Sequence, residues 1–201
     1  MAGFGCRLSC IGIALICLLF ALPASAQGWI EFVDEGELFG INLPHTPSVE
    51  DVIYTSEFGA DFPAKVFTAS DEYTNYKITV VNYADSPIQH PWRVWDFTGS
   101  VAYAAWQIRK RGGDITYDGW TEADRIPGHQ LQITNSDQSR TYAAIHSHGT
   151  RLYIFEAVAT PGAVPPIHFQ QSVIVLDEAV MSFVTIRIFA PGLIRDAERP
   201  S

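Results

Sequence analysis

The chain has 201 residues, with 22 acidic and 13 basic side chains and a formal net charge of −9 at pH 7. Nucleic-acid binding depends on clustered lysine and arginine, so this charge balance argues against a nucleic-acid partner and against an anionic membrane surface. The three cysteines, Cys6, Cys10 and Cys17, all lie within the first 26 residues. The remaining chain has no thiol, so it can form no disulfide and offers no thiolate ligand or nucleophile.

The first 26 residues have the pattern of a secretory signal peptide. Arg7 supplies the positive charge, residues 11–22 are apolar, and small residues at positions 24–26 precede Gln27. The apolar run is shorter than the roughly 20 residues that a membrane-spanning helix needs. We therefore expect cleavage after Ala26, a periplasmic or secreted product, and no membrane span after cleavage.

Short paired strands are predicted in the first half of the remaining chain. The acidic turn at residues 34–37 separates two apolar runs, and the loop around Gly59 separates the next two. Residues 75–83 are predicted as a central strand, because both of their alternating faces are largely apolar. The predicted strands of this part cover residues 30–33, 38–43, 51–56, 64–69 and 75–83.

The pattern then changes to a helical one between Val94 and Arg111, where apolar residues recur every three or four positions and Gly112-Gly113 follows. A second helix is expected at residues 165–178, which begin with two prolines. The other strands of this part are expected at residues 114–120, 129–134, 140–148, 151–159 and 183–189.

These elements predict one domain over residues 27–194, followed by a polar tail at residues 195–201. Hairpins dominate the order of elements, so the sheet should be mainly antiparallel. The expected fold class is α+β, a mainly antiparallel sheet with two principal helices packed on it.

The layout resembles the fold shared by the photosystem II extrinsic protein PsbP and the Ran-binding protein Mog1, a fold also found in small exported bacterial proteins of unknown role. The segments that carry the resemblance are Phe39-Gly40-Ile41-Asn42-Leu43-Pro44, the strand Tyr76–Tyr83, Ile126-Pro127-Gly128-His129, Arg151-Leu152-Tyr153 and the terminal residues 169–189. The resemblance implies a PsbP/Mog1-like, noncatalytic domain that docks onto a larger partner. It implies no substrate.

Three histidines are candidate metal ligands. His146 and His148 lie two positions apart on a predicted strand, so their rings project from one face and could share a zinc or copper ion. His129, on a neighbouring predicted strand, or His168 could supply the third ligand. The structural alternative is that these histidines are ordinary polar residues near the hairpin turn at Gly149.

Trp92, Arg93 and Trp95 form a candidate binding surface at the start of the first predicted helix. Tryptophan and arginine are enriched at the energetic centres of protein interfaces. The structural alternative is that these aromatic side chains belong to the core.

Taken together, the residues favour an exported, noncatalytic binding or interaction module whose partner is unknown. No G-x-S-x-G elbow and no D-x-D-x-D-G calcium loop occurs in the sequence. The alternatives are a small metal-dependent hydrolase that uses His146 and His148, and a protein that holds a small apolar ligand between sheet and helix. No cofactor is expected unless zinc binds at the histidines.

Overall fold

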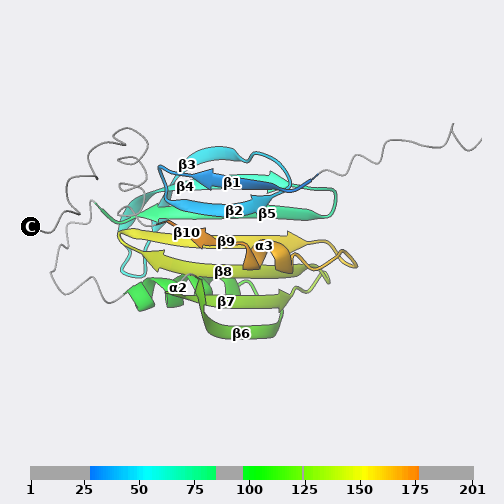
Figure 1. The fold of residues 1–201 in the computed structure, drawn as a ribbon. Helices are drawn as coiled ribbons and strands as arrows, with labels where there is room; N and C mark the ends of the chain where they lie inside the picture. Colours follow the sequence, from blue (N-terminus) through cyan, green and yellow to red (C-terminus); the bar gives the residue numbers. More distant parts are fainter. Residues whose placement is uncertain (1–27, 85–96, 124, 177–201) are drawn as a thin grey trace, which may run out of the picture.

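Two antiparallel sheets stack face to face in the computed structural model, which describes residues 28–84, 97–123 and 125–176 (Figure 1). The large sheet contains, in spatial order, β3 (Ser48–Thr55), β4 (Asp61–Ser70), β5 (Thr74–Asn82), β9 (Arg151–Ala159), β8 (Arg140–His148), β7 (Ile126–Thr134) and β6 (Asp114–Ala123). The small sheet contains β1 (Ile30–Asp34), β2 (Phe39–Leu43) and β10 (Ile174–Val175), with β2 in the middle.

Helix α2 (Phe97–Arg109) and the short helix α3 (Ile167–Gln171) lie on opposite faces of the large sheet. The helix α2 packs on β7, β8 and β9, whereas α3 lies beside the small sheet and contacts β2, β8 and β9. Figure 1 shows the small sheet and α3 in front of the large sheet, with α2 behind it. In the described part of the chain, no helix has the length and apolar character to cross a membrane.

The expected α+β class with two principal helices was wrong. The described chain is mostly β, with two antiparallel sheets, and only α2 is longer than one or two turns. The helix expected at residues 165–178 is α3, which ends at Gln171 and is followed by the strand β10. The hydroxyl of Ser172 donates to the carbonyl of Phe169 and accepts the backbone N–H of Asn42. The β-branched residues Ile174 and Val175 then pair with β2, because such side chains suit a pleated sheet better than a helix.

The antiparallel strands were predicted correctly in most of the described chain. Strands β8 and β9 have the predicted bounds, and β5 is an interior strand of the large sheet with apolar residues on both faces. The tight connection at Gly149 joins β8 to β9, as the sequence indicated. The predicted signal peptide, the strand at residues 183–189 and the tail at residues 195–201 lie outside the described residues.

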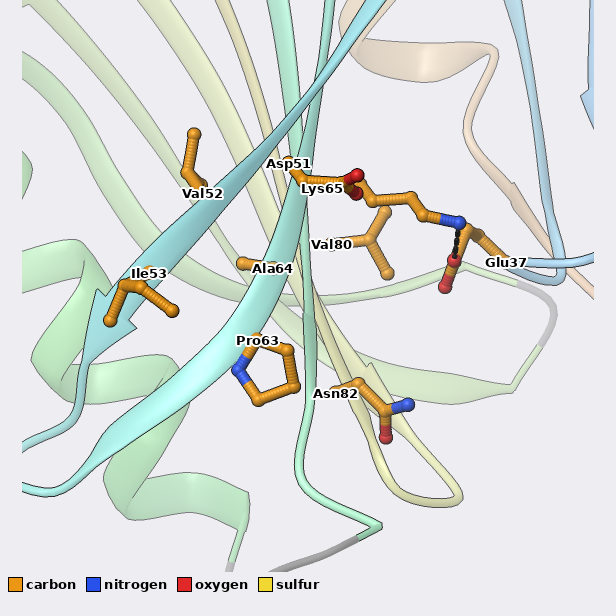
Figure 2. Close-up of a pocket in the computed structure, with 9 residues that line it drawn as sticks. All are labelled: Glu37, Asp51, Val52, Ile53, Pro63, Ala64, Lys65, Val80 and Asn82. Carbon is orange, nitrogen blue, oxygen red and sulfur yellow. Dashed lines mark ion pairs between the residues drawn. The ribbon is translucent and has the colours of Figure 1, made fainter.

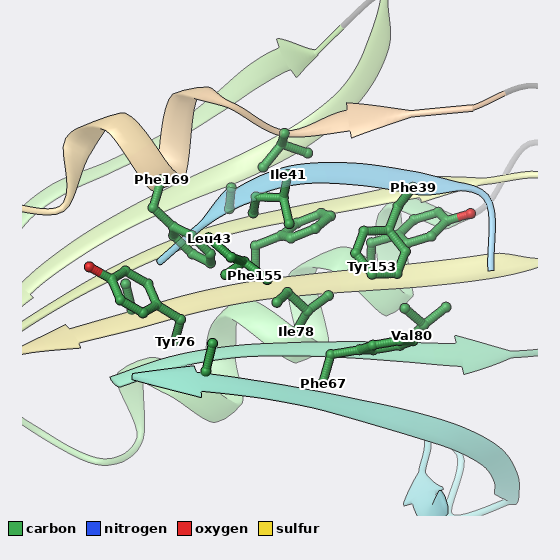
Figure 3. Close-up of a cluster of buried hydrophobic side chains, with 14 of the residues drawn as sticks. Phe39, Ile41, Leu43, Phe67, Tyr76, Ile78, Val80, Tyr153, Phe155 and Phe169 are labelled. Carbon is green, nitrogen blue, oxygen red and sulfur yellow. The ribbon is translucent and has the colours of Figure 1, made fainter. Parts of the chain in front are cut away.

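Each face of the large sheet has its own apolar core. The core under the small sheet is rich in aromatic rings, including Phe39, Phe67, Phe155 and Tyr153 (Figure 3). The core under α2 is mostly aliphatic, although it includes Phe62, and the helix contributes four residues from one of its faces. These four residues are Val101, Ala104, Ala105 and Ile108.

Candidate binding pocket

The large sheet carries an open pocket of about 520 Å³ where β3, β4 and β5 extend beyond the small sheet (Figure 2). This volume falls within the range of small-molecule and side-chain pockets. Strands β3 to β5 supply most of the wall, and the turn between β1 and β2 supplies one residue. The lining residues are Glu37, Asp51, Val52, Ile53, Pro63, Ala64, Lys65, Val80 and Asn82.

Pro63 explains why the pocket opens at this place. The ladder between β4 and β5 begins with Ala64 opposite Val81, so Pro63 lies one residue beyond it. Proline has no backbone N–H to donate and cannot extend that ladder. Figure 2 shows the side chains of Pro63 and Asn82 at the end of the pocket where the two strands separate.

Glu37 closes the other end of the pocket and is held by two basic side chains. Its Oε1 lies 2.8 Å from Nζ of Lys65, and its Oε2 lies 3.4 Å from Nε of Arg151. Arg151 also donates to the carbonyl of Gly36, and the buried hydroxyl of Tyr153 donates to the carbonyl of Glu37. The hydrogen bond and the charge of Glu37 raise the pKa of Lys65 above its usual value. Glu37, Lys65 and Arg151 therefore form a charged rim at this end of the pocket, and their contacts with one another need no ligand.

The edge strand β3 forms the outer wall of the pocket. On the pocket face it presents Val49 and Ile53, which are 55% and 68% exposed, with Asp51 between them. Asp51 lies opposite Lys65 in the ladder, but the amine of Lys65 bonds Glu37 instead. The result is an apolar–acidic–apolar row along an open edge.

A second polar cluster joins α2 to strands β6 and β7. Nε and Nη2 of Arg109 donate to both carboxylate oxygens of Asp118, at 2.6 and 2.8 Å. Nε2 of His129 lies 2.5 Å from the same carboxylate, and the ring of Trp120 meets the His129 ring edge-on at 5.0 Å. Hydrogen bonds from Arg109, followed by those from His129, lower the pKa of Asp118 despite its partial burial. His129 is only 6% exposed, so this cluster fastens the end of α2 to the sheet.

The three histidines of the predicted metal site are not on one face. His129 lies opposite Ile145, which belongs to the core under α2, whereas His146 lies opposite Tyr153 on the face of the small sheet. His148 shares the face of His146 and lies at the end of β8. Among the described residues, no group of three or more His, Cys, Asp or Glu side chains could hold a metal ion. Metal binding by His146 and His148 therefore stays a prediction that needs a ligand other than His129.

His146 is buried against the backbone of the neighbouring strand. It is 1% exposed and faces Gly128, where an added Cβ would lie well inside contact distance of its Nδ1. Burial lowers the pKa of His146, and backbone groups of Ile126 and Pro127 oppose the shift. The neutral ring therefore acts as a core side chain above a glycine.

Trp92, Arg93 and Trp95, the predicted binding surface, lie outside the described residues. The sequence interpretation also missed the pocket residues Glu37 and Lys65. One signal was present: Pro63 inside a predicted hairpin indicates that a ladder ends there. The closure of the pocket by Glu37 depends on how the two sheets stack, which no local pattern shows.

Comparisons with known proteins give similarity of fold only. No protein-family model matches the chain, and a comparison with curated proteins gave no match. The structure is similar to cyanobacterial PsbP from Synechocystis sp. PCC 6803, with a TM-score of 0.48 and 13% identity over 77% of this chain and 96% of that protein. It is also similar to PA94 from Pseudomonas aeruginosa, a protein of unknown function, with a TM-score of 0.33 and 13% identity over 76% of this chain and 99% of that one. No functional argument rests on these similarities.

Proposed function

We propose that this protein is an exported, noncatalytic binding module that takes an extended segment of a partner along β3, with apolar side chains in and beside the pocket. The observation that carries the proposal is the row Val49, Asp51 and Ile53 on a sheet edge next to a preformed pocket. A strand added at such an edge gains backbone hydrogen bonds, and pockets beside it select the side chains.

The two edges of the large sheet differ, and the difference favours β3. Strand β3 pairs with β4 over eight residue pairs without a register shift, and it contains no lysine or proline. Strand β6 has a register irregularity between Ile115 and Tyr117, and its Asp118 is bound to Arg109. Bulges, lysines and prolines are the usual means of blocking an edge, so within the described residues β3 is the edge that is left open to pairing.

The charges of β3 favour a basic partner segment. Glu50 and Asp51 are neighbours on this strand and point to opposite faces. Within the described part of the chain, neither carboxylate makes an ion pair. A partner strand with a lysine between two apolar residues would place the lysine opposite Asp51, where unlike charges stabilise a cross-strand pair.

A charge-swap experiment tests this proposal with two labelled peptides. The first has the core Val-Thr-Lys-Thr-Val with blocked ends, and the second replaces its lysine with glutamate. We expect fluorescence anisotropy to show tighter binding of the lysine peptide to the natural protein, and a reversed preference for Asp51→Lys. A change of roughly threefold in each direction is expected for an exposed cross-strand charge pair.

Glu50→Lys is the matched control, because it makes the same change of net charge on the same strand but on the other face. It should keep the preference for the lysine peptide. Equal affinities for both peptides in the natural protein, or the same response from Glu50→Lys and Asp51→Lys, would refute docking at this row.

Export is supported by the signal-peptide pattern of residues 1–26. Intact-mass measurement of the protein made by an exporting cell should give the mass of residues 27–201. A product that retains residues 1–26 would contradict this part of the proposal.

A further inference from the structure

The described chain ends beside the binding pocket, and residues 177–201 continue from there. The backbone N–H of Leu176 donates to the carbonyl of Leu38 at 2.9 Å. Leu38 follows Glu37, whose carboxylate contacts Lys65 of β4 at the rim of the pocket. The C-terminal segment therefore begins close to the strands that carry the open edge.

Residues 183–189 have the composition of a strand that is apolar on both faces. Their sequence is Phe-Val-Thr-Ile-Arg-Ile-Phe, in which every residue except Arg187 is β-branched or aromatic. Pro191-Gly192 follows, and such a pair ends a strand. A segment of this kind gains backbone hydrogen bonds by pairing with the open edge of an existing sheet.

The charge of this segment complements the charge on the pocket face of β3. Arg187 is the only charged residue in the sequence 183–189. Asp51 is exposed between two apolar side chains of β3, and it makes no ion pair among the described residues. Unlike charges that lie directly opposite each other stabilise a pair of strands. A register with Arg187 opposite Asp51 is therefore favoured.

The same register suits the other face of β3. Val52 and Tyr54 are only partly buried, and both pack against the core under α2. With Arg187 opposite Asp51, an isoleucine lies opposite Val52 in either strand direction, Ile186 if the strands are antiparallel and Ile188 if they are parallel. The added strand would thus extend this apolar core.

The connection is long enough for this pairing. Arg187 follows Leu176 by 11 residues, which span up to about 36 Å when they are extended. A strand added beyond β3 lies two strand spacings from β4, or about 10 Å. Lys65 of β4 already reaches Glu37, next to the residue that Leu176 contacts.

We propose that residues 183–189 of this chain pair with β3 and compete with the partner segment for this edge. The proposal rests on the strand docking proposed above and adds its regulation. The short tether gives the segment a high effective concentration, but a single added strand is weakly held, so it covers the edge for only part of the time. Such a cover limits unwanted edge-to-edge pairing and leaves the edge accessible to a partner segment that binds more tightly.

Hydrogen exchange of the mature chain without peptide tests the cover. We expect Arg187→Glu to speed exchange at alternate residues between Ser48 and Thr55 by about two- to threefold, because glutamate opposite Asp51 repels it. The affinity for the Val-Thr-Lys-Thr-Val peptide should rise by about twofold, because the competing segment is weakened. Asp51→Lys combined with Arg187→Glu should restore slow exchange in β3.

Arg195→Glu is the matched control, because it makes the same change of charge outside residues 183–189. It should leave both the exchange of β3 and the peptide affinity as in the natural protein. Exchange in β8 and β9 should be unchanged in every variant, which shows that the fold is kept.

Equal exchange of β3 in Arg187→Glu and Arg195→Glu would overturn the proposal. Protection of β3 that rises with protein concentration would also overturn it, since the added strand would then come from a second copy of the chain. These failures leave the partner docking intact if the natural protein still prefers the lysine peptide. Failure of Arg187→Glu to bind the lysine peptide would instead refute strand docking at β3 itself, because this variant has the less covered edge.

Discussion

The two faces of the large sheet are covered in different ways. On one face the small sheet and α3 cover an aromatic core, and Glu37, Lys65 and Arg151 form a charged contact where this cover ends. On the other face a single helix covers an aliphatic core, and polar clusters flank the helix at both ends. The comparison indicates that apolar packing holds the small sheet, whereas charged contacts at its ends help to place α2.

The charged contacts of α2 differ at its two ends. In its last turn Arg109 pairs with Asp118, and just beyond the helix Arg111 pairs with the buried Glu156. Near its first turn, Glu57 bonds Ser100 and has no cationic partner among the described residues. Ion pairs thus hold the C-terminal end of α2, whereas a hydrogen bond between a carboxylate and a hydroxyl lies at its N-terminal end.

The largest effect is expected from truncating the aromatic core. Phe155 is fully buried and contacts Phe39 at 5.9 Å between ring centroids. Phe155→Ala should lower the free energy of unfolding by about 3–5 kcal/mol, measured by urea denaturation. Ile108→Val, under α2, should cost only about 0.5–1.5 kcal/mol. A loss of stability in Phe155→Ala no larger than that of Ile108→Val would contradict the dominant role of the aromatic core.

Gly128→Ala tests the contact between β7 and the buried ring of His146. An added Cβ would also lie 2.5 Å from the carbonyl oxygen of Ile145, which is backbone and cannot move away cheaply. We expect a loss of about 1–3 kcal/mol in the free energy of unfolding. A variant as stable as the natural protein would show that His146 does not lie over this glycine.

Asp118→Asn tests whether the contacts of Asp118 with Arg109 and His129 help to hold α2 on the sheet. Because the folded pKa of Asp118 is lowered, its charged contacts stabilise the protein above the unfolded pKa of about 4 and are lost as the pH falls below that value. At pH 7 the variant should be less stable by about 1–2 kcal/mol, and the difference should shrink during acidification below about pH 4.

Asp114→Asn is the control for this pH series, because Asp114 is exposed on the same strand and makes no ion pair among the described residues. It should change stability little at any pH. An Asp118→Asn difference that stays constant down to pH 2 would show that the charge of Asp118 is not what holds α2.

The smallest expected effect has the opposite sign. Gly99 lies in the first turn of α2, and an added Cβ would meet Glu57 at an ordinary contact distance of 3.8 Å. Gly99→Ala should therefore stabilise the protein by about 0.5 kcal/mol, since alanine loses less backbone entropy in a helix. Destabilisation measured by thermal unfolding would indicate that Glu57 is closer to the helix than described.

The hairpins could be predicted from the sequence, because alternating side chains and turn residues are local signals. The strands β8 and β9 follow from the two apolar runs on both sides of the Gly149 turn. The error at residues 165–178 arose because Ile167, Gln171 and Ile174 are spaced like a helix face and two prolines precede them. The β-branched residues Val173 to Val175 were the signal against a long helix.

The candidate sites were harder to predict, because they depend on contacts between distant segments. Glu37 meets Lys65 only because the turn of the small sheet ends above β4. Asp118 reaches His129 through the pairing of β6 with β7, which includes a register irregularity that the sequence does not show. A charged residue in a turn is ordinarily a solvated one, so nothing local singled out Glu37 or Glu57.

The open edge of β3 is the central functional claim, and hydrogen exchange of its backbone amides tests it most directly. We predict that adding the Val-Thr-Lys-Thr-Val peptide slows exchange at alternate residues between Ser48 and Thr55, because an added strand bonds only the outward-facing N–H groups. Exchange in β6 should not change. Slower exchange along β6, or no change along β3 at saturating peptide, would contradict the account.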